Sequence, residues 1–182
     1  MSEKATLRRA IREAAKLQAK DAWYAEDRMS CEVFLDSMHY RRAARIFAFI
    51  PFGCEVDITP ILYDVLQNKT LAIPIAHPDS TLTFHPVTSL ENLGVGEYGV
   101  AQPTAGVPVT PTAKDLMLVP ALAYTKAGVR LGRGKGYYDR YLAAYPTTFT
   151  VGICRSFQLL EEIPHQGWDR PVETVLCAGV WY

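Results

Sequence analysis

Apolar residues near the start of the chain recur at helical spacing and predict two helices. The first is expected to begin near Ser2 or Glu3, and the second to cover residues 25–38. The apolar stripe of the first helix is formed by Leu7, Ile11, Ala14 and Gln18, with Ala10 and Leu17 beside them, and that of the second by Cys31, Phe34, Leu35 and Met38.

Short apolar runs farther along the chain predict strands that alternate with two more helices. A helix capped by Thr59, with Pro60 at its first position, is expected to run to about Gln67, and another to cover 137–144. Residues 94–111 are rich in Gly, Pro and Thr, which predicts a loop. Buried strands are expected at 45–51, 71–74, 115–120, 149–153 and 172–178, and a half-exposed strand at 81–85.

The alternation of strands and helices predicts an α/β fold. We expect three layers, α/β/α, around a largely parallel central sheet, formed by residues 1–182 as a single domain. Sheets of this kind bind ligands beyond the carboxyl ends of their strands. Three segments follow predicted strands: residues 52–57, residues 124–138 and the stretch after Cys154. They are therefore expected to meet at one ligand site.

Composition excludes several classes of protein. The chain is 49% hydrophobic and 21% charged, and its formal net charge is zero because 19 Lys and Arg balance 19 Asp and Glu. Proteins that bind nucleic acids or membrane surfaces generally have a basic face, and a net charge of zero does not indicate one. The first residues are charged throughout and no apolar run is long enough to cross a bilayer, so we expect a cytoplasmic protein. The four cysteines form no CxxC pair, which favours reduced thiols.

One segment, residues 128–139 with the sequence GVRLGRGKGYYD, carries the features of an anion site. Its glycines alternate with Arg130, Arg133 and Lys135, so the backbone can approach a ligand closely and its N–H groups can form a nest for an anion. The helix that follows adds free N–H groups and the positive end of its dipole. The spacing matches neither the Walker A motif nor the dinucleotide fingerprint. By composition alone, a purely structural glycine turn stays open.

Asp139, at the end of this segment, would repel a phosphate unless a cation lay between them. A magnesium ion that bridges the carboxylate and the phosphate oxygens satisfies both charges. Alternatively, Asp139 favours the first turn of its helix or pairs with Arg140 or Arg133. The residues alone leave both interpretations open.

Residues 120–142, PALAYTKAGVRLGRGKGYYDRYL, resemble the signature of the 5-formyltetrahydrofolate cyclo-ligases, also called methenyltetrahydrofolate synthetases. Three further pieces resemble this family in order and spacing, so the resemblance covers nearly the whole chain. They are Lys4 and Arg8 with Leu7 between them, residues 52–57 followed by Thr59 and Pro60, and residues 98–103.

The resemblance implies ATP-dependent closure of 5-formyltetrahydrofolate to 5,10-methenyltetrahydrofolate, with release of ADP and phosphate. ATP is then the co-substrate and Mg²⁺ the cofactor. The formyl oxygen is phosphorylated to an iminophosphate, and N10 of the folate attacks the activated carbon. A monomer that binds these small molecules is expected.

The resemblance also implies roles for individual residues. Arg133 and Lys135 stabilise charge on the transferred phosphoryl group. Asp139 is a magnesium ligand. Glu173 stands where the family has a second metal-binding Asp, although it can instead be a polar residue at a strand edge. The predicted ATP-binding residues are Lys4, Arg8, Arg130, Leu131, Gly132, Arg133, Gly134, Lys135, Gly136, Tyr137 and Tyr138, and the predicted substrate-binding residues are Phe52, Glu55, Tyr98, Arg133, Gly134, Lys135, Gly136 and Tyr137.

Other reactive residue types give weaker indications. The histidines show no metal-ligand spacing, and Cys54 has no base nearby in the sequence that would make it a nucleophile. Tyr98 is expected to stack on a pterin rather than on an adenine. Trp168 is expected either to pack or to line the mouth of the site.

Two other functions fit parts of the sequence. A non-catalytic nucleotide sensor would keep the Gly-rich segment but needs neither Glu55 nor Asp139. A nucleic-acid-binding module could use Arg130, Arg133 and Lys135, but a net charge of zero does not favour it.

Overall fold

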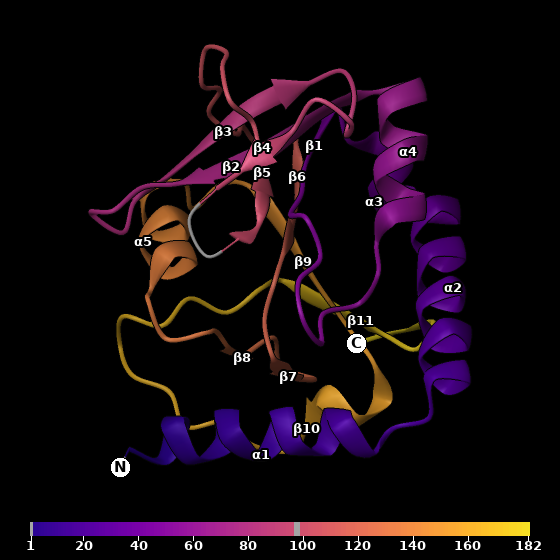
Figure 1. Cartoon of the computed structure of the whole chain (residues 1–182), viewed down its shortest axis with the longest axis vertical. Helices are drawn as coiled ribbons and strands as arrows, with labels where there is room; N and C mark the ends of the chain where they lie inside the picture. The colour runs from indigo at the N-terminus through magenta and orange to yellow at the C-terminus, as the bar shows by residue number, and fades with distance from the viewer. Residues whose placement is uncertain (1, 97–98) are drawn as a thin grey trace.

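The structure, a computed structural model, describes residues 2–96 and 99–182 and is organised around a seven-stranded sheet (Figure 1). The inner strands run parallel, and the edge strands β12 and β3 are each antiparallel to their neighbour. In spatial order the strands are β12 (Val180–Trp181), β11 (Thr174–Cys177), β9 (Phe149–Cys154), β6 (Leu116–Val119), β1 (Arg45–Phe47), β2 (Thr70–Ala76) and β3 (Leu82–Val87).

Helices cover both faces of this sheet, because successive side chains of a strand point to opposite sides and both sides are apolar. Ile46 of β1 belongs to a core cluster with Phe34 and Leu62, and the next residue, Phe47, belongs to a second cluster with Leu142. This confirms the expected three-layer α/β/α fold. The first face is covered by α2 (Lys20–Asp36), α3 (Met38–Arg42) and α4 (Thr59–Asn68), and the second by α5 (Tyr137–Ala144) (Figure 1).

A smaller sheet, which the sequence did not predict, lies at one end of the molecule and is covered by α1 (Glu3–Leu17). Ile11 of α1 belongs to a third core cluster with Leu122 and Leu131, and α1 runs beneath β7 and β10 in Figure 1. Among the described residues, none of the helices is both long and apolar enough to span a bilayer. The small sheet consists of β7 (Ala123–Thr125), β8 (Arg130–Leu131) and β10 (Leu159–Leu160), with the 3-10 helix η2 (Ser156–Gln158) before β10, and β4 (Gly94–Val95) pairs with β5 (Ala101–Gln102).

The two larger sheets meet where a glycine faces a tyrosine. Gly152 of β9 lies against the ring of Tyr124 in β7, and a Cβ at position 152 would lie only 2.4 Å from Cε1 of that ring. Tyr124 is fully buried, and its hydroxyl donates a hydrogen bond to the Val119 carbonyl. The absence of a side chain at Gly152 therefore lets the small sheet pack directly on the central one.

Some helix boundaries differ from the expected ones. The second helix begins at Lys20 rather than at residue 25, and it ends at Asp36 because Ser37 interrupts it. The Ser37 hydroxyl donates to the Phe34 carbonyl and accepts from the Tyr40 N–H, which closes one helix and starts the next. A serine that satisfies backbone groups in this way outweighs the apolar periodicity that runs across it.

Other boundaries were close. The helices that start at Glu3 and cover 137–144 are confirmed. Thr59 is the first residue of α4 rather than its cap. Leu17 and Met38, which were expected on apolar stripes, are exposed because they lie at the end of α1 and the start of α3. The strand expected at 172–178 is β11, and it is followed by one more edge strand, β12.

The contact between Gly152 and Tyr124 leads to a stability prediction. Gly152→Ala should lower the free energy of unfolding by about 1–3 kcal/mol, because the added methyl group overlaps a buried ring. Gly167→Ala is the matched control, since an added Cβ there meets nothing within 4 Å. Urea unfolding of both variants measures the difference. Equal stabilities would contradict the close approach.

Candidate functional site

A cavity of about 1270 Å³ opens at the carboxyl ends of the central strands. Its wall includes Phe49 after β1, Pro74 of β2 and Pro120 after β6. The segments 52–57 and 124–138 both reach it, as expected. The stretch directly after Cys154 does not, and its place is taken by residues 164–170 and by the start of α1.

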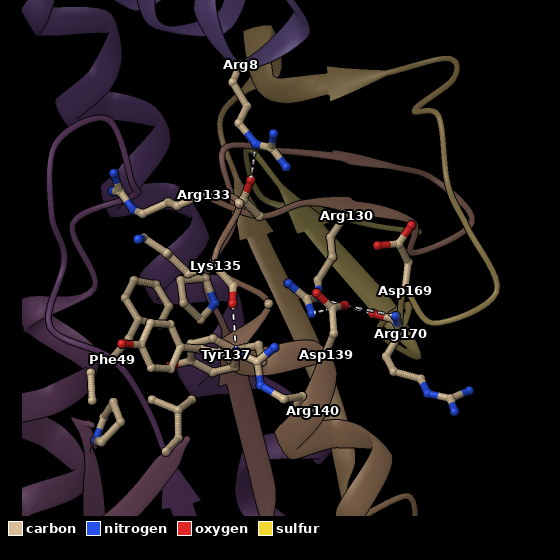
Figure 2. A pocket seen from close by; sticks show the side chains of 18 of the residues that line it. Arg8, Phe49, Arg130, Arg133, Lys135, Tyr137, Asp139, Arg140, Asp169 and Arg170 are labelled. Carbon is tan, nitrogen blue, oxygen red and sulfur yellow. Dashed lines mark hydrogen bonds and ion pairs between the residues drawn. The ribbon is translucent and has the colours of Figure 1, made fainter. Parts of the chain in front are cut away.

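The Gly-rich segment forms one wall of this cavity and is held in shape by two arginines. Gly136, just before α5, has a left-handed backbone with φ of 70°. Arg140 donates to the carbonyl oxygens of Lys135 and Ser80, each at 2.7 Å. Arg8 of α1 donates through Nε to the Gly132 carbonyl at 2.7 Å (Figure 2). The loop is therefore fixed from both sides while its glycines face the cavity.

The cations predicted to bind phosphate differ in how they are engaged. Lys135 lines the cavity, and no described residue forms a hydrogen bond or ion pair with its ammonium group. Lys4 is paired with Asp169. The guanidinium of Arg130 donates to Asp139 at 2.6 Å and to the Arg170 carbonyl at 3.0 Å. Among the described residues, Lys135 has no partner and Arg8 has only the Gly132 carbonyl at its Nε, so a ligand can bind either cation without breaking an ion pair.

Burial separates the remaining predicted nucleotide residues. Leu131 lies in the core cluster under α1 and not on the cavity wall, so only its backbone can serve a nucleotide. The side chain of Arg130 is only 4% exposed, which removes it from any nucleic-acid-binding surface. Tyr137 and Tyr138 both line the cavity, and the Tyr137 hydroxyl donates to the His77 carbonyl at 2.9 Å. Of these residues, only Leu131 lacks a place on the wall.

Glu55 and Arg133 form an ion pair at another part of the wall. Arg133 donates to Oε1 of Glu55 through Nη2 at 2.8 Å and through Nε at 3.0 Å. The other carboxylate oxygen accepts from the Phe52 N–H at 2.9 Å, and the Phe52 carbonyl accepts from Arg133. The guanidinium also lies over the Phe52 ring, 4.8 Å from its centroid. Burial raises the pKa of the Glu55 carboxyl, and the nearby charge of Arg133 opposes that rise.

The turn that carries Glu55 is held from behind by residues that sequence reasoning missed. Arg155, directly after β9, forms two 2.7 Å hydrogen bonds to Asp27 of α2. It also donates to the carbonyl oxygens of Cys54 at 2.8 Å and Glu55 at 3.1 Å, and its guanidinium lies 4.0 Å from the centre of the Trp23 ring. The sequence contained a signal for this pair, because Asp27 is a charged residue on the apolar stripe of α2, four residues before Cys31. A charged residue at such a position is expected to be buried and to need a partner.

The predicted metal ligands lie in different surroundings. Asp139 lines the cavity, and its Oδ1 accepts from Arg130 and from the Arg170 N–H, while no described residue donates to Oδ2. Glu173 does not line the cavity, and its carboxylate accepts from the Thr150 N–H at 2.7 Å and from the Thr150 hydroxyl. The structure therefore does not bring Glu173 to the cavity with Asp139. Within residues 2–96 and 99–182, no cluster of three His, Cys, Asp or Glu side chains could hold a metal ion.

Single carboxylates suit magnesium when phosphates supply other ligands. Mg²⁺ keeps several waters and takes one or two protein carboxylates beside the phosphates of its substrate. The available Oδ2 of Asp139 fits that requirement, whereas the described residues form no all-protein cage. Of the other side chains considered, Trp168 lines the cavity, Cys54 is buried with its pKa raised by burial, and Tyr98 lies outside the described residues.

Comparison with known proteins gives a consistent result. A profile of the 5-formyltetrahydrofolate cyclo-ligase family matches residues 1–178. The 5-formyltetrahydrofolate cyclo-ligase of Escherichia coli K12 is 30% identical over 150 residues, which cover 76% of this chain and 81% of the relative. That of Haemophilus influenzae is 28% identical over 152 residues, covering 78% and 80%. The NMR structure of Aquifex aeolicus 5,10-methenyltetrahydrofolate synthetase superposes with a TM-score of 0.88 at 29% identity, covering 99% of this chain and 92% of that one. The chain belongs to this family and is an enzyme of this kind.

The buried pair behind Glu55 leads to a second stability prediction. Asp27→Asn should lower the free energy of unfolding by about 3–5 kcal/mol, because it leaves the charge of buried Arg155 without a carboxylate. Glu32→Gln on the same helix removes an exposed ion pair with Arg28 and should change stability by less than about 1 kcal/mol. Denaturant unfolding measures both. Similar decreases in the free energy of unfolding of the two variants would show that the buried Asp27–Arg155 pair is no more costly to break than an exposed one.

Proposed function

We propose that this member of the 5-formyltetrahydrofolate cyclo-ligase family uses ATP to close 5-formyltetrahydrofolate to 5,10-methenyltetrahydrofolate in the cavity described above. The observation that carries this proposal is the meeting, in one cavity, of the Gly-rich basic loop with the turn that bears Glu55. One wall suits a polyanion, and the other offers a buried carboxylate and an aromatic ring to a flat heterocycle. A cavity of about 1270 Å³ has room for both ligands.

The nucleotide end lies along the loop from Arg130 to Tyr138. Backbone N–H groups of the loop and of the first turn of α5 receive the phosphates. Lys135 contacts them first, because its ammonium group is unpaired among the described residues. Lys4 and Arg8 close over the phosphates from α1, whose start also lines the cavity. Asp139 would hold Mg²⁺ through its available carboxylate oxygen, and the ion would neutralise negative charge on the phosphates.

The folate end lies at Phe52 and Glu55. The Phe52 side chain is 45% exposed at the cavity, so its ring can stack on a pterin. The buried carboxylate of Glu55 accepts a hydrogen bond from an N–H group of the folate and so fixes the position of the reacting nitrogens. Arg155 acts only through the backbone at Cys54 and Glu55, so it is a positioning residue and not a catalytic one.

The chemistry needs an activated formyl oxygen, because the oxygen of a formamide is a poor leaving group. The formyl oxygen attacks the terminal phosphorus of ATP, the bond to the bridging oxygen breaks, and ADP leaves. N10 then attacks the formyl carbon, loses its proton, and the phosphate departs with the former formyl oxygen. Lys135 and Arg133 stabilise negative charge on the phosphoryl group during its transfer. The loop contributes by holding the reactants in line.

The competing functions have less support. A nucleotide sensor needs no acid in its pocket, but Glu55 and Asp139 both line this cavity. A nucleic-acid-binding surface would need exposed cations in a row, but Arg130 is buried and Arg133 is held by Glu55. The proposed ligase accounts for both the acids and the cations.

The decisive experiment is a direct assay of the purified protein with 5-formyltetrahydrofolate, ATP and Mg²⁺. Methenyl absorbance should appear, and ADP should form in equal amount. Omission of ATP or chelation of Mg²⁺ should abolish the product. Well-folded protein that binds both ligands yet forms no methenyl product would refute the proposed reaction.

Lys135 gives the sharpest mutational test of this function. Lys135→Ala should reduce kcat by about 100-fold or more, as removal of one group that stabilises transition-state charge does. Its stability should change by less than about 0.5 kcal/mol, because the side chain is exposed and has no partner among the described residues. Lys114→Ala, at an exposed lysine outside the cavity, is the control and should keep full activity. A fully active Lys135→Ala protein would contradict the assigned role.

A further inference from the structure

Arg133 is engaged by the residues that the proposed function assigns to the folate. Its guanidinium donates twice to Oε1 of Glu55 and once to the Phe52 carbonyl, and it covers the Phe52 ring. The proposed function nevertheless needs Arg133 at the phosphates and needs Glu55 and Phe52 for the folate. The same side chains cannot satisfy both arrangements at once.

The direction of the side chain supports this conflict. In Figure 2, Arg133 and Lys135 extend to the same side of the view, and the group formed by Arg130, Asp139 and Asp169 lies on the other side. That group contains the proposed metal ligand, Asp139, and so marks the side of the cavity where the metal would bind. Arg133 is flanked by Gly132 and Gly134, so the backbone on either side can rotate without a Cβ in the way. The side chain is therefore held by Glu55 and the Phe52 carbonyl on the side of the cavity away from Asp139.

We infer that the Glu55–Arg133 ion pair is a latch that couples folate binding to nucleotide binding; the inference rests on the proposed function. A reduced folate that stacks on Phe52 and bonds to Glu55 displaces Arg133 from both. The freed guanidinium then turns to the phosphates. In the reverse order, a nucleotide that draws Arg133 away uncovers Glu55 and Phe52 for the folate.

The sign of the coupling follows from the closed latch of the ligand-free protein. Whichever ligand binds first must break the ion pair, and the second ligand binds to a protein in which the pair is already broken. The two ligands therefore favour each other, and linkage requires the two affinities to rise by the same factor. Because Arg133 is 35% exposed, the pair is partly screened, and we expect a factor of about ten.

Calorimetric titrations of the whole protein test the latch without turnover. The probes are a non-hydrolysable ATP analogue with Mg²⁺, and 5-formyltetrahydrofolate. In the wild-type protein, saturating folate should raise the affinity for the ATP analogue about tenfold, and saturating analogue should raise the affinity for the folate by the same factor. Without folate, the Glu55→Gln variant should bind the ATP analogue about as tightly as the folate-saturated wild-type protein does. Saturating folate should then change the affinity of the variant for the analogue by less than about twofold.

Asp169→Asn is the matched control. It also removes a carboxylate partner from a cation in the cavity, Lys4, but it leaves the Glu55–Arg133 pair intact. Its nucleotide affinity can change, while the tenfold coupling to the folate should persist.

Three outcomes would overturn the latch: no coupling in the wild-type protein, full coupling in a folded Glu55→Gln, or loss of coupling in Asp169→Asn. The wild-type titrations need no variant, so a poorly folded Glu55→Gln does not prevent the test. A protein that forms methenyl product without coupling refutes the latch alone. A protein that shows coupling without product refutes the proposed reaction alone.

Discussion

The ion pair between Asp27 and Arg155 is the interaction on which the rest of the site depends. It joins α2, the end of β9 and the turn that carries Glu55, three segments that are far apart in the sequence. Both side chains are buried, and burial raises the pKa of Asp27 while the hydrogen bonds from Arg155 oppose that rise. A buried pair of this kind contributes little to net stability but is very costly to break. Through the hydrogen bonds of Arg155 to the Cys54 and Glu55 carbonyl oxygens, the pair holds the turn against α2 and the end of β9.

A second constraint is the balance of charge within the cavity. Lys4, Arg130 and Arg133 each have a carboxylate partner, and the three partners, Asp169, Asp139 and Glu55, come from three different parts of the chain. Lys135 has no carboxylate partner among the described residues. These pairs keep several cations together in one place without strong mutual repulsion. A polyanionic ligand that bound as proposed would change this pairing, which would link its binding to charge and local movement. Arg133 is the residue where this linkage has the clearest structural basis.

The sequence predicted the elements whose signals are local. The apolar runs of the central strands, the start of α1 near Ser2 or Glu3 and the span 137–144 of α5 depend on neighbouring residues, and all appear in the structure. The two-residue strands β8 and β10 were missed, because such short strands have no periodicity of their own. The apolar spacing predicted one helix that continues past Ser37, but the structure has two helices separated at Ser37.

By itself, the sequence determined the fold class through its alternating strands and helices and the family through its resemblance to a known signature, and it made the Gly-rich segment a candidate anion site. Only the tertiary structure decided which cation is available and which is paired. Glu55 and Arg133 are 78 residues apart, and Lys4 and Asp169 are 165 apart. It also placed Glu173 against Thr150 and outside the cavity. Such pairings follow from how the layers pack, and the energy of a charge depends on its partners and its burial rather than on its neighbours in the chain.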